Sequence, residues 1–284
     1  MKRLYGFSTC GAKPTDRASL ASYRAAGIEA LEFVINGSRM DDIFHTLDYK
    51  KLASDVREEG ILPWSFHLPF IPFETLNIAT VDRELLKKSV HDFGEILRHV
   101  GDAGIPTAVI HPSGEPNAPE IRAEIMKNAK EGLAALAPIA AESGVTLAVE
   151  DLPRTCLGNS SAEILDLISA DDRLRVCFDT NHLLDEDIPT FMRAVGSKIH
   201  TVHISDYDFI DERHWLPGEG KIDWASVMRV FDEIGYAGPF IYELGFGAPK
   251  TLTRPRALTA EDFVRNAREL HEGKPLTVIG KSLL

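Results

Sequence analysis

Acidic and imidazole side chains recur at the ends of short apolar runs in this chain. In the stretch RVCFDTNHLL, residues 175–184, an apolar run ends in Asp179 and His182 follows three residues later. Such an Asp is by itself an ordinary turn or helix-cap residue. Carboxylates in apolar segments are costly, however, unless they are paired, hydrogen-bonded or bound to a cation. The repetition therefore indicates a functional site, whose other members are Glu32, His67, His111, Glu150, His203 and Glu243.

Four of these side chains suit a metal ion. Three carboxylates and one imidazole that converge on one point repel one another unless a positive charge lies among them. Oxygen ligands with a single nitrogen suit Mn, Mg, Co or Zn better than a soft metal. We therefore expect one divalent metal ion (Mn, Mg, Co or Zn) surrounded by Glu150, Asp179, His203 and Glu243.

Eight short runs rich in Val, Ile and Phe must position these residues. The segments between them have helical periodicity; over residues 82–104, for example, Leu86, Val90, Phe93 and Leu97 fall three or four apart. Alternating strands and helices predict a parallel sheet, and eight such units predict closure into an α/β fold, the (β/α)8 TIM barrel. The predicted strands cover residues 4–9, 30–35, 64–70, 107–112, 146–151, 175–180, 200–206 and 240–245.

A barrel also explains how distant residues meet. Active-site residues of such barrels lie at the carboxyl ends of the strands, so the polar side chains would share one rim. The alternative, a doubly wound open sheet, lacks support because no glycine-rich dinucleotide fingerprint follows the first run. We find no linker or low-complexity tract, so residues 1–284 are expected to form a single domain.

Five stretches in order along the chain, AVEDLP, CFDTNHLL, HTVHISD, HWLPGEGKIDW and IYELG, resemble the xylose isomerase-like TIM-barrel superfamily. This superfamily comprises sugar phosphate isomerases and epimerases and also contains the apurinic endonucleases. The stretch HWLPGEGKIDW, residues 214–224, is the most specific of the five. The resemblance implies Glu150, Asp179, His203 and Glu243 as metal ligands, and His67, His111, His182 and His214 as pocket residues that bind substrate.

The reaction that the resemblance implies is isomerisation or epimerisation of a keto sugar or related polyol. A carbonyl polarised by the metal acidifies the adjacent C–H, so an enediolate intermediate can form. Glu150 and Glu243 would then be the catalytic acid/base pair that removes and returns the proton. The aromatic residues Phe7, Phe70, Phe209 and Trp215 could pack against the sugar.

Alternative functions remain open at this point. An inosose-type dehydratase is close in mechanism, and a barrel that binds a sugar or metal without turnover is a further possibility. The main rival is an apurinic endonuclease-like metal-dependent hydrolase with three zinc ions, for which His67, His111, Glu212 and His214 are candidate extra ligands. Glu212 stands where the nuclease pattern has Asp, and the net charge of −12 disfavours a nucleic-acid partner. We therefore predict one ion and a small-molecule sugar substrate.

Composition sets the remaining expectations. The chain has 44% hydrophobic residues, enough for a sizeable core, and its three cysteines lack metal-site spacing. Reduced thiols and the absence of a signal peptide or of a membrane-length apolar run lead us to expect a cytoplasmic protein with no membrane association. Homo-oligomerisation is expected only from the resemblance.

Overall fold

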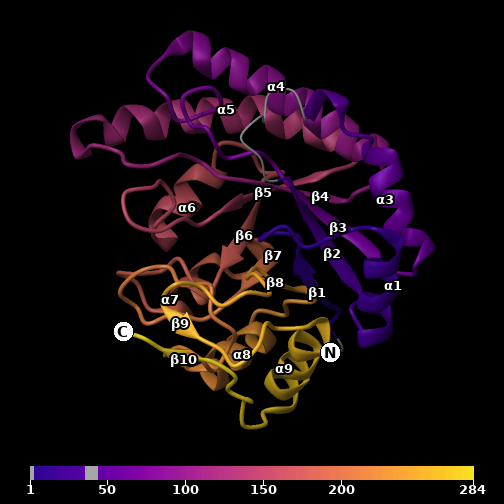
Figure 1. The fold of residues 1–284 in the computed structure, drawn as a ribbon. Helices are drawn as coiled ribbons and strands as arrows, with labels where there is room; N and C mark the ends of the chain where they lie inside the picture. The colour runs from indigo at the N-terminus through magenta and orange to yellow at the C-terminus, as the bar shows by residue number, and fades with distance from the viewer. Residues whose placement is uncertain (1–2, 36–43) are drawn as a thin grey trace.

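The predicted strands pair in chain order and close on themselves. In the computed structural model, which describes residues 3–35 and 44–284, neighbouring strands are parallel and the last of the eight pairs with the first (Figure 1). The prediction of a (β/α)8 barrel is confirmed, and the open sheet is excluded. The strands are β1 (Tyr5–Ser8), β2 (Ala30–Val34), β3 (Leu62–His67), β4 (Thr107–Ile110), β5 (Thr146–Glu150), β6 (Arg175–Asp179), β7 (Ile199–Ile204) and β8 (Phe240–Tyr242).

All eight strands end before the predicted residue, and proline explains the cases of β3 and β4. Pro69 and Pro112 have no backbone N–H and cannot continue a hydrogen-bonded ladder. The third strand therefore ends at His67 rather than residue 70, and the fourth at Ile110 rather than residue 112. The eighth strand is also short, so His111 and Glu243 lie just beyond strand ends.

Helices surround the barrel (Figure 1). Most begin at an Asp, Ser or Thr whose side chain accepts backbone N–H groups of the first turn, as Asp82 does for Glu84 and Leu85. The longest pair, α4 and α5, lie side by side, and Gly101 lets their ends meet because a Cβ there would lie 2.2 Å from Ser143 O. The helices are α1 (Arg17–Ala26), α3 (Tyr49–Glu58), α4 (Arg83–Asp102), α5 (Arg122–Glu142), α6 (Ser161–Ile168), α7 (Ile188–Val195), α8 (Trp224–Glu233) and α9 (Ala260–Glu272).

Short elements complete the described chain. Single turns of 3-10 helix cover Pro119–Ile121 and Gly196–Lys198. Strands β9 (Leu252–Thr253) and β10 (Lys281–Ser282) form a small antiparallel sheet outside the barrel, which the sequence did not predict. None of the helices in the described part of the chain has both the length and the apolar character needed to cross a bilayer.

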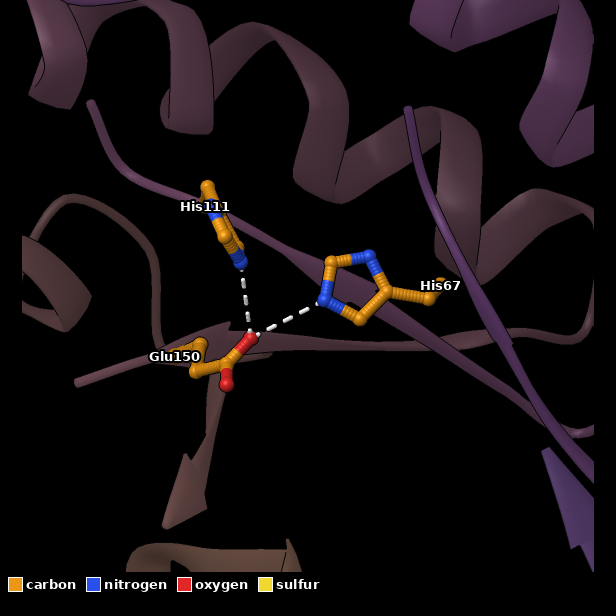
Figure 2. A group of neighbouring side chains, drawn as sticks. All are labelled: His67, His111 and Glu150. Carbon is orange, nitrogen blue, oxygen red and sulfur yellow. Dashed lines mark hydrogen bonds and ion pairs between the residues drawn. The ribbon is translucent and has the colours of Figure 1, made fainter. Parts of the chain in front are cut away.

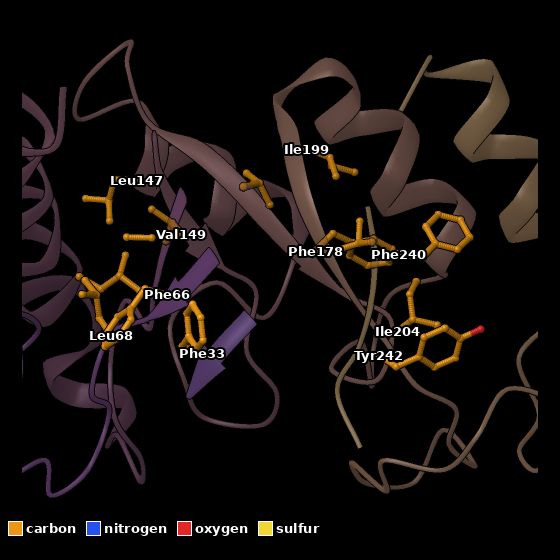
Figure 3. Packing of buried hydrophobic residues seen from close by; sticks show 14 of the residues in the cluster. Phe33, Phe66, Leu68, Leu147, Val149, Phe178, Ile199, Ile204, Phe240 and Tyr242 are labelled. Carbon is orange, nitrogen blue, oxygen red and sulfur yellow. The ribbon is translucent and has the colours of Figure 1, made fainter. Parts of the chain in front are cut away.

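Alternate residues of each strand point to opposite sides of the barrel wall. One set, which includes Phe66, Val149 and Phe178, packs with helix side chains in the main core (Figure 3). Burying each of these large side chains contributes about 1.5–3 kcal/mol. The other set faces the barrel interior, where Val109, Ala148 and Cys177 form a separate cluster. Two residues further along the same strands, this interior face presents His111, Glu150 and Asp179.

Candidate metal centre

The alternation that builds the core also gathers the predicted metal ligands. Glu150, Asp179 and His203 lie on interior-facing positions of β5, β6 and β7, and Glu243 directly follows β8. Each contributes one ligand atom to a group in which all atoms lie within 4.8 Å of one another. The structure thus brings together the four residues that the sequence proposed as ligands.

The geometry around His203 fits a cation. Its Nε2 lies 3.1 Å from the carboxylate of Glu32, so that nitrogen is placed to donate its proton there. Its Nδ1 then faces three carboxylate oxygens, which are Glu150 Oε1 at 2.9 Å, Glu243 Oε2 at 3.1 Å and Asp179 Oδ2 at 3.9 Å. Asp179 Oδ2 is buried and has no hydrogen-bond partner among the described residues. One imidazole cannot satisfy three carboxylates, whereas a divalent ion can.

The pKa shifts of the residues in this cluster also indicate a site that favours a positive charge. Burial opposes a charge on His203, but the acidic groups around it outweigh burial and raise its pKa well above the usual value. Burial and repulsion from Glu243 raise the pKa of Asp179 well above its usual value. Burial also disfavours ionisation of Glu150, yet His203 and His111 hold its pKa well below the usual value. In the metal-free protein, bound protons therefore offset the negative charge of these carboxylates. A bound cation would replace those protons.

Glu32 is the hydrogen-bond partner of His203 on the side away from the predicted metal ligands. The sequence named Glu32 as a member of the functional site, and in the structure its side chain is fully buried and faces His203. Ser65 Oγ donates to Glu32 Oε2 at 2.8 Å, which fixes the carboxylate. A carboxylate that holds the remote N–H of a metal-binding imidazole fixes its tautomer and orientation. Its interior-facing position in β2 was the available signal, but the partner could not be read from the sequence.

His67 and His111 converge on the other oxygen of Glu150. Figure 2 shows both imidazoles pointing at Glu150 Oε2, from which their Nε2 atoms lie 3.1 and 3.2 Å away. His67 Nδ1 lies 2.8 Å from Leu68 O and is placed to donate its proton to that carbonyl. Burial opposes protonation of His67, but its contact with Glu150 prevails and raises its pKa to about 9. These three residues form a second possible ligand group.

His182, Glu212 and His214 form another possible ligand group, which lies beside Asp179. His182 Nδ1 lies 2.7 Å from Asp151 O, and its Nε2 lies 3.6 Å from Asp179 Oδ2 and 3.5 Å from Glu212 Oε2. His214 Nδ1 lies 2.9 Å from Glu243 O, and its backbone has a φ of 51°. Both imidazoles are thus held by carbonyl oxygens at Nδ1, which leaves Nε2 available to a ligand.

All four histidines predicted to bind substrate line one pocket of about 200 Å³. Asp179 and His203 are fully buried and do not line it, whereas Glu150 and Glu243 do. Of the aromatic candidates, Phe70 lines the pocket and its ring lies 4.6 Å from that of His111. Phe7 and Trp215 are buried in the protein, and Phe209 is 40% exposed on a loop. A concave pocket with several polar side chains converging on it suits a small molecule.

Known proteins resemble this chain as follows. The chain matches the family described as xylose isomerase-like TIM barrel over residues 20–263. An inosose isomerase of Bacillus velezensis is 30% identical over 165 residues, which cover 54% of this chain and 56% of that protein. A protein named probable endonuclease 4 of Thermoplasma acidophilum is 25% identical over 213 residues, covering 68% and 71%.

Solved structures agree on the fold. A D-tagatose 3-epimerase-like protein matches with a TM-score of 0.73 at 24% identity, covering 85% of this chain and 90% of that chain. The chain spans less than two thirds of the length of the first curated relatives it matches.

Proposed function

Because the chain belongs to the xylose isomerase-like TIM-barrel family, we propose that it is a metal-dependent isomerase or epimerase of a keto sugar or related polyol. The observation that carries this proposal is the pair of carboxylates on His203. Glu150 and Glu243 approach its Nδ1 to 2.9 and 3.1 Å from strands β5 and β8, which lie to either side of β7 in the barrel. Two carboxylates placed around one point can act on two faces of a small substrate.

Glu150, Asp179, His203 and Glu243 would hold the ion, and the buried Asp179 Oδ2, which has no hydrogen-bond partner among the described residues, supports this assignment. When bound, a divalent ion polarises a carbonyl and acidifies the C–H next to it.

Glu150 and Glu243 would move the proton. One carboxylate removes it from the carbon beside the carbonyl, which gives an enediolate, and the other returns it. Proton transfer by a positioned group contributes roughly 10²- to 10⁴-fold. His182 and His214 would bind substrate oxygens through their Nε2 atoms, because carbonyl oxygens hold their Nδ1 atoms. His67 and His111 line the same pocket with their Nε2 atoms on Glu150, and they would bind the substrate beside that carboxylate. The relative named inosose isomerase supports a reaction of this class.

A second candidate function rests on the two further ligand groups. His67, His111 and Glu150 on one side, and His182, Glu212 and His214 on the other, could hold additional ions beside the first. A site with several ions suits hydrolysis of a phosphodiester, because neighbouring metals can stabilise both the attacking and the leaving oxygen. The similarity to the relative named probable endonuclease 4 supports this second candidate function. An inosose-type dehydratase would use the same carboxylate pair.

Metal analysis after extensive dialysis separates these candidates. We expect one strongly bound divalent ion per chain, together with turnover of a member of a panel of keto sugars and inososes assayed with Mn, Mg, Co and Zn. About three zinc ions per chain, combined with cleavage of abasic DNA, would overturn the isomerase proposal in favour of the hydrolase.

A further inference from the structure

Arg154 sits at the mouth of the pocket and already has acidic partners. It follows β5, and among the described residues that line the pocket it carries the one guanidinium or ammonium group. Its Nε lies 3.1 and 3.0 Å from the two oxygens of Glu115, and its Nη2 also contacts that carboxylate. Its Nη1 lies 2.7 Å from Asp211 Oδ1, and its Nη2 lies 3.4 Å from Glu212 Oε1. Arg154 therefore ties together loops after β4, β5 and β7.

The neighbouring guanidinium is occupied in the same way. Arg213 Nε lies 3.1 Å from Asp208 Oδ2, and its Nη1 lies 3.9 Å from Asp211 Oδ2. The hydrogen bond from Arg154 holds the pKa of Glu115 below its usual value, so Glu115 is ionised at neutral pH. Four carboxylates thus face two guanidinium groups in this cluster, and the excess negative charge lies beside the three members that line the pocket, Glu115, Arg154 and Glu212.

The glycine-rich loop after β7 offers no replacement anion site. Phosphate often binds such loops of a barrel through backbone N–H groups. Here the carboxylate of Asp206 takes those donors, with Gly218 N at 2.8 Å, Ile222 N at 3.2 Å and the indole nitrogen of Trp224 at 2.9 Å. Gly220 closes around the same group, because a Cβ there would lie 2.2 Å from Asp206 Oδ1. The loop is folded on a carboxylate of its own.

We propose that the pocket selects an uncharged sugar over its phosphate ester. Arg154 then connects the three loops through its ion pairs and does not bind a substrate anion. This inference rests on the proposed isomerase or epimerase function and names its substrate class. A phosphate group at the mouth would have to displace a carboxylate from Arg154 and then remain beside the excess negative charge. Repulsion between the phosphate and a nearby, partly exposed carboxylate should weaken binding of the ester by roughly tenfold or more. The same charge opposes a phosphodiester backbone.

The test compares an accepted keto sugar with its terminal phosphate ester. For the wild type we expect kcat/KM to be about tenfold or more higher for the uncharged sugar. The double variant Glu115→Gln, Asp211→Asn leaves Glu212 as the remaining acidic partner of Arg154. It should reduce the ratio of kcat/KM for the sugar to kcat/KM for the ester, chiefly by lowering KM for the ester. The matched control Glu95→Gln, Asp102→Asn removes two carboxylates from the exposed side of α4. A wild-type preference for the ester, or equal ratios in the two double variants, would overturn the proposal.

A binding measurement separates this inference from the proposed reaction. Calorimetry with a hexitol and its terminal phosphate, neither of which can isomerise, is carried out on the metal-loaded wild type and on Glu115→Gln. If no keto sugar is converted but the hexitol binds more tightly than its phosphate, the selection stands and the isomerase proposal fails. If the wild type does not bind the hexitol more tightly than the phosphate, the selection itself is refuted.

Discussion

Replacing Glu32 by glutamine should weaken metal binding without changing the shape of the site. Both Glu32 oxygens lie 3.1 Å from His203 Nε2, and the side chain is fully buried. Glutamine keeps one oxygen as an acceptor but loses the negative charge. Its NH2 group can face Ser65 Oγ, which now donates to Glu32 Oε2. His203 would then keep its proton on Nε2, though it would be held less firmly and would be a less basic ligand at Nδ1.

The size of the effect follows from the hydrogen bond that changes. A hydrogen bond to a charged group contributes about 1.5–3 kcal/mol, and a neutral one about 0.5–1.5 kcal/mol. The difference of about 1–2 kcal/mol corresponds to roughly a five- to thirtyfold loss of metal affinity. Substitutions of residues that support a metal ligand in this way typically cost about 10- to 100-fold, which overlaps this range.

The assay is a competition titration of Mn²⁺ against a fluorescent chelator, with circular dichroism to confirm the fold. Ser65→Ala serves as the graded control, because it removes one hydrogen bond from Glu32 but leaves the charge, and it should lose less affinity than Glu32→Gln. Glu95→Gln, on the outer surface of α4, should not change the affinity. Wild-type affinity in Glu32→Gln, with clear losses in Glu150→Gln and Asp179→Asn, would refute the supporting role of Glu32.

Three further predictions concern catalysis and stability. Glu150→Gln and Glu243→Gln should each abolish turnover in a folded barrel, measured as kcat; a near-normal rate with metal still bound would contradict the acid/base assignment. Turnover in deuterated water should place deuterium on the carbon next to the carbonyl, detected by NMR, and an unlabelled product would argue for a hydride shift. Burial opposes ionisation of Asp262, but Arg256 and the backbone N–H of Thr259 lower its pKa to about 2. The stabilisation by this lowered pKa is complete above about pH 4 and is lost as the pH falls towards 2, so Asp262→Asn should lower the free energy of unfolding at pH 7 by about 2 kcal/mol. Urea denaturation between pH 2 and 7 tests this, and a variant as stable as wild type at pH 7 would contradict it.

The strands and the clustering of Glu150, Asp179, His203 and Glu243 were accessible from the sequence because both follow the two-residue period of a strand. Val149 and Phe178 mark the core-facing positions, so Glu150 and Asp179 must face the barrel interior. The period does not say which interior groups meet across the barrel. Glu32 and His203 lie 171 residues apart, and their contact depends on closure of the sheet.

Loop geometry lies further beyond such reasoning. Arg154 adopts a φ of 54° and reaches acidic partners on loops after two other strands, and no periodic pattern constrains those loops. The pair β9 and β10 is too short, at two residues each, to show a strand period. The sequence therefore predicts the residues of the centre better than it predicts what surrounds the mouth of the pocket.

The loop that folds around Asp206 has a consequence for how relatives of this protein are recognised. Its string HWLPGEGKIDW is the most distinctive in the chain, yet Gly218, Gly220 and Trp224 in it are required by the shape of the loop rather than by a reaction. The residues that shape this loop are therefore distinct from pocket residues such as His182 and Glu115. A shared HWLPGEGKIDW string therefore indicates a shared loop structure, and the residues that line the pocket are the better guide to a shared substrate.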